Sequence, residues 1–275
     1  MTAVPSVALN NGVTIPQVGF GVFKVPEEQT VDAVRSALDA GYRSIDTAAL
    51  YQNERAVGAA LAESGIPREE LFVTTKVWNS AHGHDRALRA FDTSLAKLGL
   101  EYVDLYLIHW PVPAKERYVE TWSALEKLLA DGRARAIGVS NFQPAHLQRL
   151  LDASDVVPAV NQIELHPNLP QRELREFHAR HGIVTEAWSP LARGGLLDDP
   201  TVTELAERLG RTPAQVILRW HLQLGNVVIP KSVTPRRIRE NIALFDFELS
   251  EQDLAAIDAL ENGRRIGPHP DHFNR

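Results

Sequence analysis

Short β-branched runs alternate with longer amphipathic runs along most of the chain. The short runs, four to seven residues long with few exceptions, predict buried strands. The longer runs carry apolar residues at helical spacing and predict helices. The predicted strands are Gln17–Gly21, Ser44–Asp46, Phe72–Lys76, Val103–His109, Ala134–Ser140, Ala159–Glu164, Val184–Trp188 and Asn226–Pro230. The predicted helices include Thr30–Ala40, Glu54–Ser64, His84–Leu98, Tyr118–Asp131, Pro144–Leu151, Gln171–His181, Pro213–Leu224 and Ser250–Leu260.

Local signals support several of these boundaries. Gly41, Gly132 and Gly182 follow three of the predicted helices, where a C-terminal glycine is favoured. Ser250 precedes two acidic residues and is a suitable N-cap. Before the first of these strands, two short runs flank an Asn-Gly pair, which predicts a β-hairpin; the runs are Val7–Leu9 and Val13–Ile15.

Eight strands that alternate with about eight helices predict a (β/α)8 TIM barrel preceded by the N-terminal β-hairpin. The alternative is a doubly wound sheet, which normally carries a glycine-rich phosphate loop after a strand. The nearest candidate is Gly19-Phe20-Gly21, but Lys24 stands where a third glycine belongs. We therefore favour the barrel and expect one domain over residues 1–275.

Composition narrows the class of protein. The chain has 275 residues, of which 44% are hydrophobic and 23% charged, so a large core is expected. It has no cysteine, which excludes disulfides, thiolate catalysis and Cys-based zinc sites. The net charge of −6 comes without a long run of one sign, and no apolar run reaches the length of a membrane span. We expect a cytoplasmic, monomeric protein that binds neither nucleic acid nor membrane.

Four ionisable side chains lie at or just after the ends of three predicted strands. Asp46, Lys76 and His109 each end an apolar run, and Tyr51 follows Asp46 by five residues. Taken singly, an aspartate there is most often a turn cap, and a histidine is most often structural. In a barrel, however, these strand ends meet on one rim, where catalytic residues lie. An Asp, Tyr, Lys and His set can protonate a carbonyl oxygen, with a nearby ammonium favouring the phenolate.

Further polar residues occupy equivalent positions at other strand ends: Ser140, Asn141, Gln162, Trp188, Ser189, Lys231 and Ser232. His82 and His84 lie close in sequence, but no suitably spaced third ligand accompanies them, so we expect no metal site.

A basic segment follows the last predicted strand. Lys231, Arg236, Arg237 and Arg239 lie within nine positions, at the start of a helix. Amides at a helix N-terminus attract anions, and barrels commonly bind phosphate after strands seven and eight. A phosphate site is favoured over a solvated basic turn.

Together these segments resemble signatures of the aldo-keto reductase superfamily over nearly the whole chain. The segments are Gly41–Ala48, Tyr51–Glu54, Thr74–Lys76, Asp104–Pro111, Gly138–Phe142 and Ile229–Ser232. Trp188 stands where many relatives carry tyrosine. In this tryptophan and in its short length, the chain resembles the bacterial 2,5-diketo-D-gluconate reductase-like branch.

The resemblance implies an NADP-dependent oxidoreductase that uses NADPH to reduce aldehydes, dicarbonyls or keto sugars. By position, Tyr51 donates the proton, Lys76 and Asp46 lower its pKa, and His109 positions the carbonyl. Ser140, Asn141 and Gln162 hold the carboxamide, and Trp188 stacks on the nicotinamide. By the same resemblance, Lys231, Ser232 and Arg237 bind the 2′-phosphate, and Glu240 and Asn241 lie near the adenine. The remaining residues implied for the cofactor are Gly21, Val22, Ser189, Pro190, Leu191, Val233 and Thr234.

Phe23, Trp78 and Trp110 each follow a strand and, with His109, are expected to wall the substrate pocket. Two rival functions stay open. One is a non-catalytic NADPH-binding subunit that senses redox state. The other is a barrel isomerase whose basic segment binds a phosphorylated sugar.

Overall fold

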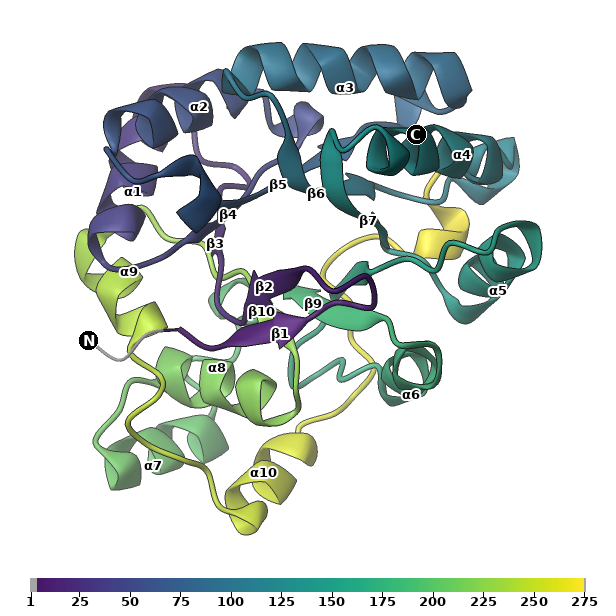
Figure 1. The fold of residues 1–275 in the computed structure, drawn as a ribbon. Coiled ribbons are helices and arrows are strands. Elements are labelled where there is room, and N and C mark those ends of the chain that lie inside the picture. Colours follow the sequence, from purple (N-terminus) through teal and green to yellow (C-terminus); the bar gives the residue numbers. More distant parts are fainter. Residues whose placement is uncertain (1–3, 275) are drawn as a thin grey trace.

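Eight parallel strands form the centre of the computed structural model, which describes residues 4–274 (Figure 1). Neighbours in the sheet follow chain order from β3 to β10. The strands are β3 (Phe20–Gly21), β4 (Ser44–Asp46), β5 (Phe72–Val77), β6 (Val103–Ile108), β7 (Ala134–Ser140), β8 (Val160–Glu164), β9 (Val184–Trp188) and β10 (Val227–Val228).

The sheet closes on itself between its first and last strands. Val18 and Val228 form a parallel bridge, and the amide of Gly19 donates to the carbonyl of Val228 at 2.8 Å. The predicted (β/α)8 barrel is therefore confirmed. The first and last strands are shorter than predicted, because one isolated bridge, between Val18 and Val228, connects segments 17–21 and 226–230 in place of a continuous ladder.

Helices surround the barrel on its outer side (Figure 1). They are α1 (Glu27–Asp39), α2 (Glu54–Glu63), α3 (His84–Leu98), α4 (Tyr118–Ala130), α5 (Pro144–Ala153), α6 (Arg172–His181), α7 (Pro200–Leu209), α8 (Pro213–Gln223), α9 (Pro235–Ile242) and α10 (Glu251–Asp258). Helix α7 was not predicted, although Asp199 caps its first turn and Val202, Leu205 and Ala206 form its buried stripe.

The predicted helix boundaries hold where a capping residue marks them. Gly41, Gly132 and Gly182 all have positive φ just beyond their helices. The Ser250 hydroxyl accepts a hydrogen bond from the amide of Asp253, and the Asp253 carboxylate accepts one from the amide of Ser250. No helix within residues 4–274 is long and apolar enough to cross a membrane.

A two-stranded hairpin, β1 (Ser6–Ala8) and β2 (Thr14–Pro16), covers the amino-terminal end of the barrel, in front of the strands in Figure 1. Its Leu9 and Ile15 are buried in one cluster with barrel residues that include Leu105 and Val160. A second, larger core lies between strands and helices. The cluster that contains Leu9 and Ile15 therefore closes the amino-terminal end of the barrel, and polar groups occupy the other end.

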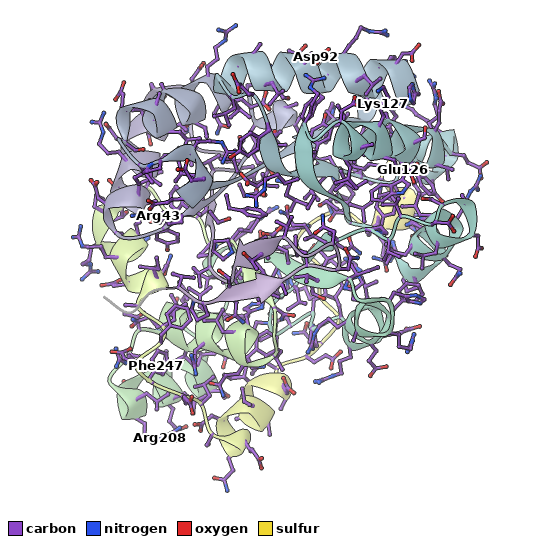
Figure 2. All side chains as sticks on the ribbon, in the orientation of Figure 1. Arg43, Asp92, Glu126, Lys127, Arg208 and Phe247 are labelled. Atoms are coloured by element: carbon purple, nitrogen blue, oxygen red, sulfur yellow. The ribbon has the colours of Figure 1, made fainter. Side chains whose placement is uncertain are left out.

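Side chains fill the space that the ribbon leaves inside the barrel (Figure 2). Toward the carboxyl ends of the strands these interior side chains become polar: Asp46, Lys76, Gln162 and Glu186 are all buried. Charges that lie so deep need partners, and these groups partner one another at this end of the barrel.

Candidate active site

A cavity of about 820 Å³ opens at the carboxyl ends of the strands. It extends from the barrel mouth to the start of α9. Most of the residues singled out in the sequence line it: Gly21, Phe23, Asp46, Tyr51, Trp78, His109, Trp110, Ser140, Asn141, Gln162, Trp188, Ser189, Pro190, Leu191, Lys231, Ser232, Arg237, Glu240 and Asn241. Strand ends far apart in sequence thus converge on one space.

Four expected residues do not line this cavity. Lys76 lies behind Asp46 and Tyr51 with a fully buried side chain. Val22 is buried, and its amide donates to the carbonyl of Asp46. Val233 is exposed, and Thr234 is the N-cap of α9, with its amide donating to Ser232 Oγ. A direct cofactor contact for Val22, Val233 or Thr234 is thus not supported by the cavity lining.

Asp46 and Lys76 form an ion pair across adjacent strands. Lys76 Nζ lies 2.7 and 2.8 Å from the two Asp46 carboxylate oxygens and 2.9 Å from the Thr47 carbonyl. Burial lowers the pKa of Lys76, but Asp46, Tyr51 and Glu186 together outweigh this, and the net pKa is raised. The lysine is therefore a fixed ammonium under the cavity floor.

The Tyr51 ring lies above this ammonium. It belongs to a single helical turn, η1 (Ala49–Tyr51), and Lys76 Nζ is 5.1 Å from the ring centroid. Loss of hydration raises the pKa of Tyr51, Lys76 lowers it and Asp46 raises it, and the net pKa is about 12. Lys76 thus acts on this pKa in the expected direction and Asp46 in the opposite direction, because a second negative charge disfavours the phenolate. At neutral pH the phenol keeps its proton.

His109 stands on the other side of the same space. Its ring centroid is 5.7 Å from that of Tyr51 and 5.1 Å from that of Trp78. Burial, together with the nearby Lys76 and His82, keeps the pKa of His109 well below its usual value, so the ring is neutral. Its Nδ1 is buried without a hydrogen-bond partner among residues 4–274, whereas Nε2 is not enclosed in this way. A neutral imidazole with Nε2 accessible can donate one hydrogen bond into the cavity.

Ser140, Asn141 and Trp188 form a hydrogen-bonded chain along the wall. Trp188 Nε1 donates to Asn141 Oδ1 at 2.8 Å, and Asn141 Nδ2 donates to the His109 carbonyl and to Ser140 Oγ, both at 3.0 Å. The Ser140 hydroxyl donates to the Gln162 carbonyl. These contacts fix the orientation of the Asn141 amide and leave oxygen lone pairs for a further donor.

The basic segment forms the far end of the cavity. Lys231, Ser232 and Arg237 line it, and no ion pair engages Lys231 or Arg237 within the described part of the chain. Arg236 instead pairs with Glu240 at 3.5 Å. Two unpaired cations near the N-terminus of α9 suit an anionic group.

Aromatic rings enclose the mouth, as expected for Phe23, Trp78 and Trp110. The structure adds Phe273, whose ring centroid lies 4.4 Å from that of Trp110 and 6.4 Å from that of Trp78. The tail that carries Phe273 is anchored to Glu164, which accepts hydrogen bonds from the amides of Ile266 and Gly267. A Cβ on Gly267 would lie 2.6 Å from the Trp188 indole, so the tail backbone rests directly on that ring.

Arg236 of the basic segment also lines the cavity, and other lining residues were not anticipated, including Lys24, Leu50, Arg193, Leu197, Asp198, Thr212, Gly267 and Phe273. Most lie in loops or in the tail, where no periodic pattern marks them. For Phe273 the only signal was an aromatic residue in an otherwise polar tail.

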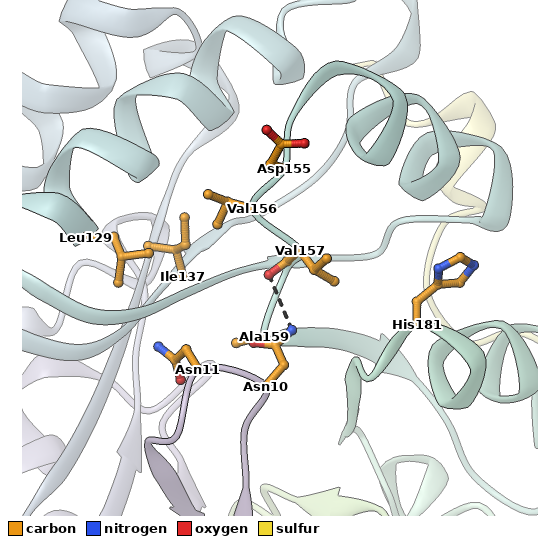
Figure 3. Close-up of a pocket in the computed structure, with 9 residues that line it drawn as sticks. All are labelled: Asn10, Asn11, Leu129, Ile137, Asp155, Val156, Val157, Ala159 and His181. Carbon is orange, nitrogen blue, oxygen red and sulfur yellow. Dashed lines mark hydrogen bonds between the residues drawn. The ribbon is translucent and has the colours of Figure 1, made fainter.

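A second cavity, of about 260 Å³, lies at the opposite end of the barrel beside the hairpin turn (Figure 3). Asn10 there donates to the carbonyls of Val157 and Pro158. Its lining has two titratable side chains, Asp155 and His181, and no member of the catalytic candidates.

Comparison with known proteins identifies the class of this site. Residues 17–262 match the model of the Aldo/keto reductase family. The chain is 54% identical over 269 residues to the glyoxal reductase of Bacillus subtilis, covering 98% of this chain and 97% of that protein. It is 51% identical over 269 residues to the methylglyoxal reductase DkgA of Escherichia coli strain K12, covering 97% of each.

Solved structures agree. A mutant of Gox0644 in complex with NADPH superposes with a TM-score of 0.95 at 48% identity, covering 99% of each chain. An aldo-keto reductase of Bombyx mori in complex with NADP superposes with a TM-score of 0.92 at 40% identity, covering 98% of this chain and 97% of that one.

Proposed function

Since this chain belongs to the aldo/keto reductase family, we propose that it is an NADPH-dependent reductase of small carbonyl compounds. The observation that carries the proposal is the convergence of Tyr51, His109 and the Asp46–Lys76 pair on one cavity. The names of two relatives, glyoxal reductase and methylglyoxal reductase, point to aldehydes and dicarbonyls as substrates. We include keto sugars in the proposed range of substrates.

The cavity fits the cofactor at both ends. Lys231, Ser232 and Arg237 offer charge and hydrogen bonds to a 2′-phosphate, which NADPH has and NADH lacks. Glu240 and Asn241 lie beside them, where the adenine would be held. At the other end, the Trp188 indole offers a flat face for the nicotinamide, and Ser140, Asn141 and Gln162 offer partners for its carboxamide.

When bound, NADPH supplies a hydride to the carbonyl carbon. The protein then has to stabilise the charge that grows on the carbonyl oxygen and to protonate it. Tyr51 holds a proton at neutral pH, and the Lys76 ammonium stabilises the phenolate that remains after donation. Neutral His109 donates a second hydrogen bond to the same oxygen and orients the substrate.

Asp46 has a different task from the one first expected. It does not make Tyr51 more acidic; it keeps the buried Lys76 charged by direct pairing. Phe23, Trp78, Trp110 and Phe273 surround the oxygen site with apolar rings, which excludes water and strengthens the hydrogen bonds.

The test is loss of NADPH absorbance with methylglyoxal and a panel of small aldehydes, together with a titration of protein fluorescence by NADPH. Turnover with NADPH that exceeds turnover with NADH supports the proposal. Binding of NADPH without turnover on any carbonyl would favour the non-catalytic sensing subunit. A lack of any fluorescence response to NADPH would favour the isomerase.

A further inference from the structure

Glu186 is a buried carboxylate beside the site, and neither the sequence signatures nor the cavity lining includes it. It lies in the middle of β9, directly paired in register with Gln162 on β8, and is 1% exposed. Glutamate is almost never buried to this degree without a specific partner. Its partner here is Gln162.

Gln162 links two carboxylates. Its Nε2 donates to Glu186 Oε2 at 2.7 Å and to Asp46 Oδ2 at 2.8 Å. Asp46 is on β4, four strands away in the eight-stranded barrel, so this contact spans the barrel interior. A primary amide has two N–H bonds, and both are used.

The two carboxylates therefore fix which way the Gln162 amide points. The Asp46 carboxylate, paired with Lys76, only accepts hydrogen bonds, so the amide nitrogen has to face it, and Glu186 keeps an acceptor oxygen whether or not it is protonated. The amide oxygen accepts no hydrogen bond among residues 4–274, and Gln162 lines the cavity. The free oxygen is then the group that meets the N–H donors of a nicotinamide carboxamide.

We propose that Glu186 is a positioning residue of the reduction site: it holds the Gln162 amide oxygen toward the nicotinamide carboxamide, and its charge acts on Tyr51. This inference rests on the proposed NADPH-dependent function.

The charge of Glu186 changes near neutral pH. Burial and the Asp46 carboxylate raise the pKa of Glu186, while the Gln162 hydrogen bond and Lys76 lower it, leaving it at about 7. The charged or titratable groups that face Glu186 are Asp46 on β4, Lys76 on β5 and Tyr51 on η1. On its other neighbour, β10, the register partner is the uncharged Val227.

The negative charge of ionised Glu186 determines the direction of its effect on Tyr51. Ionised Glu186 raises the pKa of Tyr51, because it disfavours a second negative charge nearby. When Glu186 takes up a proton, that repulsion disappears and Tyr51 donates more readily. Carbonyl reduction is therefore faster below the titration of Glu186 than above it, wherever proton donation limits turnover.

Two variants separate the two roles. In Glu186→Gln the new amide oxygen still accepts from Gln162, but the charge is gone. In Glu186→Leu the acceptor is gone as well. Binding is measured by protein fluorescence with NADP⁺ and with adenosine 2′,5′-diphosphate, which fills only the adenosine end of the cavity.

We expect Glu186→Leu to bind NADP⁺ roughly tenfold more weakly, the loss of about one oriented hydrogen bond, with adenosine 2′,5′-diphosphate binding within about twofold of wild type. Glu186→Gln should bind both ligands as wild type does. Wild-type kcat is expected to fall as the pH rises through about 7, and Glu186→Gln should lose this change. Equal weakening of both ligands in Glu186→Leu, no weakening of either, or a wild-type pH profile in Glu186→Gln would overturn the inference.

If Glu186→Leu does not fold, Glu186→Met, which also lacks the acceptor, replaces it in the two binding measurements. The proposed reductase function is tested separately: it is refuted if the wild-type protein neither binds nor oxidises NADPH. An active wild type with unaltered Glu186 variants refutes only the role of Glu186.

Discussion

Lys76 Nζ lies 2.7 Å from Asp46 Oδ1, and the two side chains are 0% and 3% exposed. Each stands at the carboxyl end of its own strand, on neighbouring strands. This pair keeps a positive charge beneath Tyr51 at every pH at which the protein would work. It also ties catalysis to folding, because neither charge is tolerated alone in the barrel interior.

Lys76→Met should therefore cost stability as well as turnover. Among residues 4–274, removing the lysine leaves the buried Asp46 carboxylate with only Gln162 as a side-chain hydrogen-bond donor, and we expect a loss of about 3–5 kcal/mol in the free energy of unfolding. The double variant Asp46→Asn with Lys76→Met should lose less, since no charge remains unpaired. Urea unfolding of the three proteins checks this; equal stabilities for wild type and Lys76→Met would contradict it.

The stability of the protein should also depend on the charge of Glu186. Its folded-state pKa of about 7 is raised above the ordinary value of 4.5, so its favourable contribution is fully present below pH 4.5 and is lost as pH rises through 7. Glu186→Gln does not titrate. Relative to wild type, this variant should gain stability between pH 5 and pH 8, by an amount on the order of 3 kcal/mol at the limit. A stability difference between the two proteins that stays constant over that range would show that Glu186 does not titrate there.

Arg237→Ala should weaken NADPH binding and spare NADH. Arg237 is exposed, lines the cavity and has no ion-pair partner within residues 4–274, so it is available to a 2′-phosphate. Loss of a charge-assisted hydrogen bond corresponds to roughly a 10- to 100-fold rise in Kd. Arg239→Ala is the matched control, because Arg239 is exposed on the same helix but does not line the cavity. Equal losses for NADPH and NADH in Arg237→Ala would argue against a phosphate contact.

Phe273→Ala should raise KM for small aldehydes several-fold while leaving the Kd for NADPH unchanged. The ring packs on Trp110 and faces Trp78, so its removal opens the apolar wall to water. His272→Ala, an exposed neighbour in the same tail, serves as the control. An unchanged KM in Phe273→Ala would mean that substrate does not reach this wall.

The chain pattern predicted the barrel and the rim residues for one physical reason. Strands buried on both faces are continuous apolar runs, so a polar residue that ends such a run, like Lys76 or His109, stands out. Parallel strands then carry those ends to one face, and the cavity confirms the convergence.

The sequence pattern did not identify functional residues that are marked neither by periodicity nor by a strand end. Phe273 lies in an irregular tail that is held by Glu164, a contact between residues more than a hundred positions apart. Glu186 lies within a strand, where an isolated charge gives no sign of whether it faces helices or the barrel interior. The effect of Asp46 on Tyr51 also needed coordinates, because its sign depends on competing charges at defined distances.

Tyr51 is the proposed proton donor in an NADPH-dependent reduction. The most direct test is NADPH oxidation with methylglyoxal by wild type and by Tyr51→Phe, with NADPH affinity measured on both by fluorescence. We predict that Tyr51→Phe binds NADPH within about twofold of wild type but turns over roughly 10²- to 10⁴-fold more slowly. Near-normal turnover in Tyr51→Phe, with binding intact, would contradict the account.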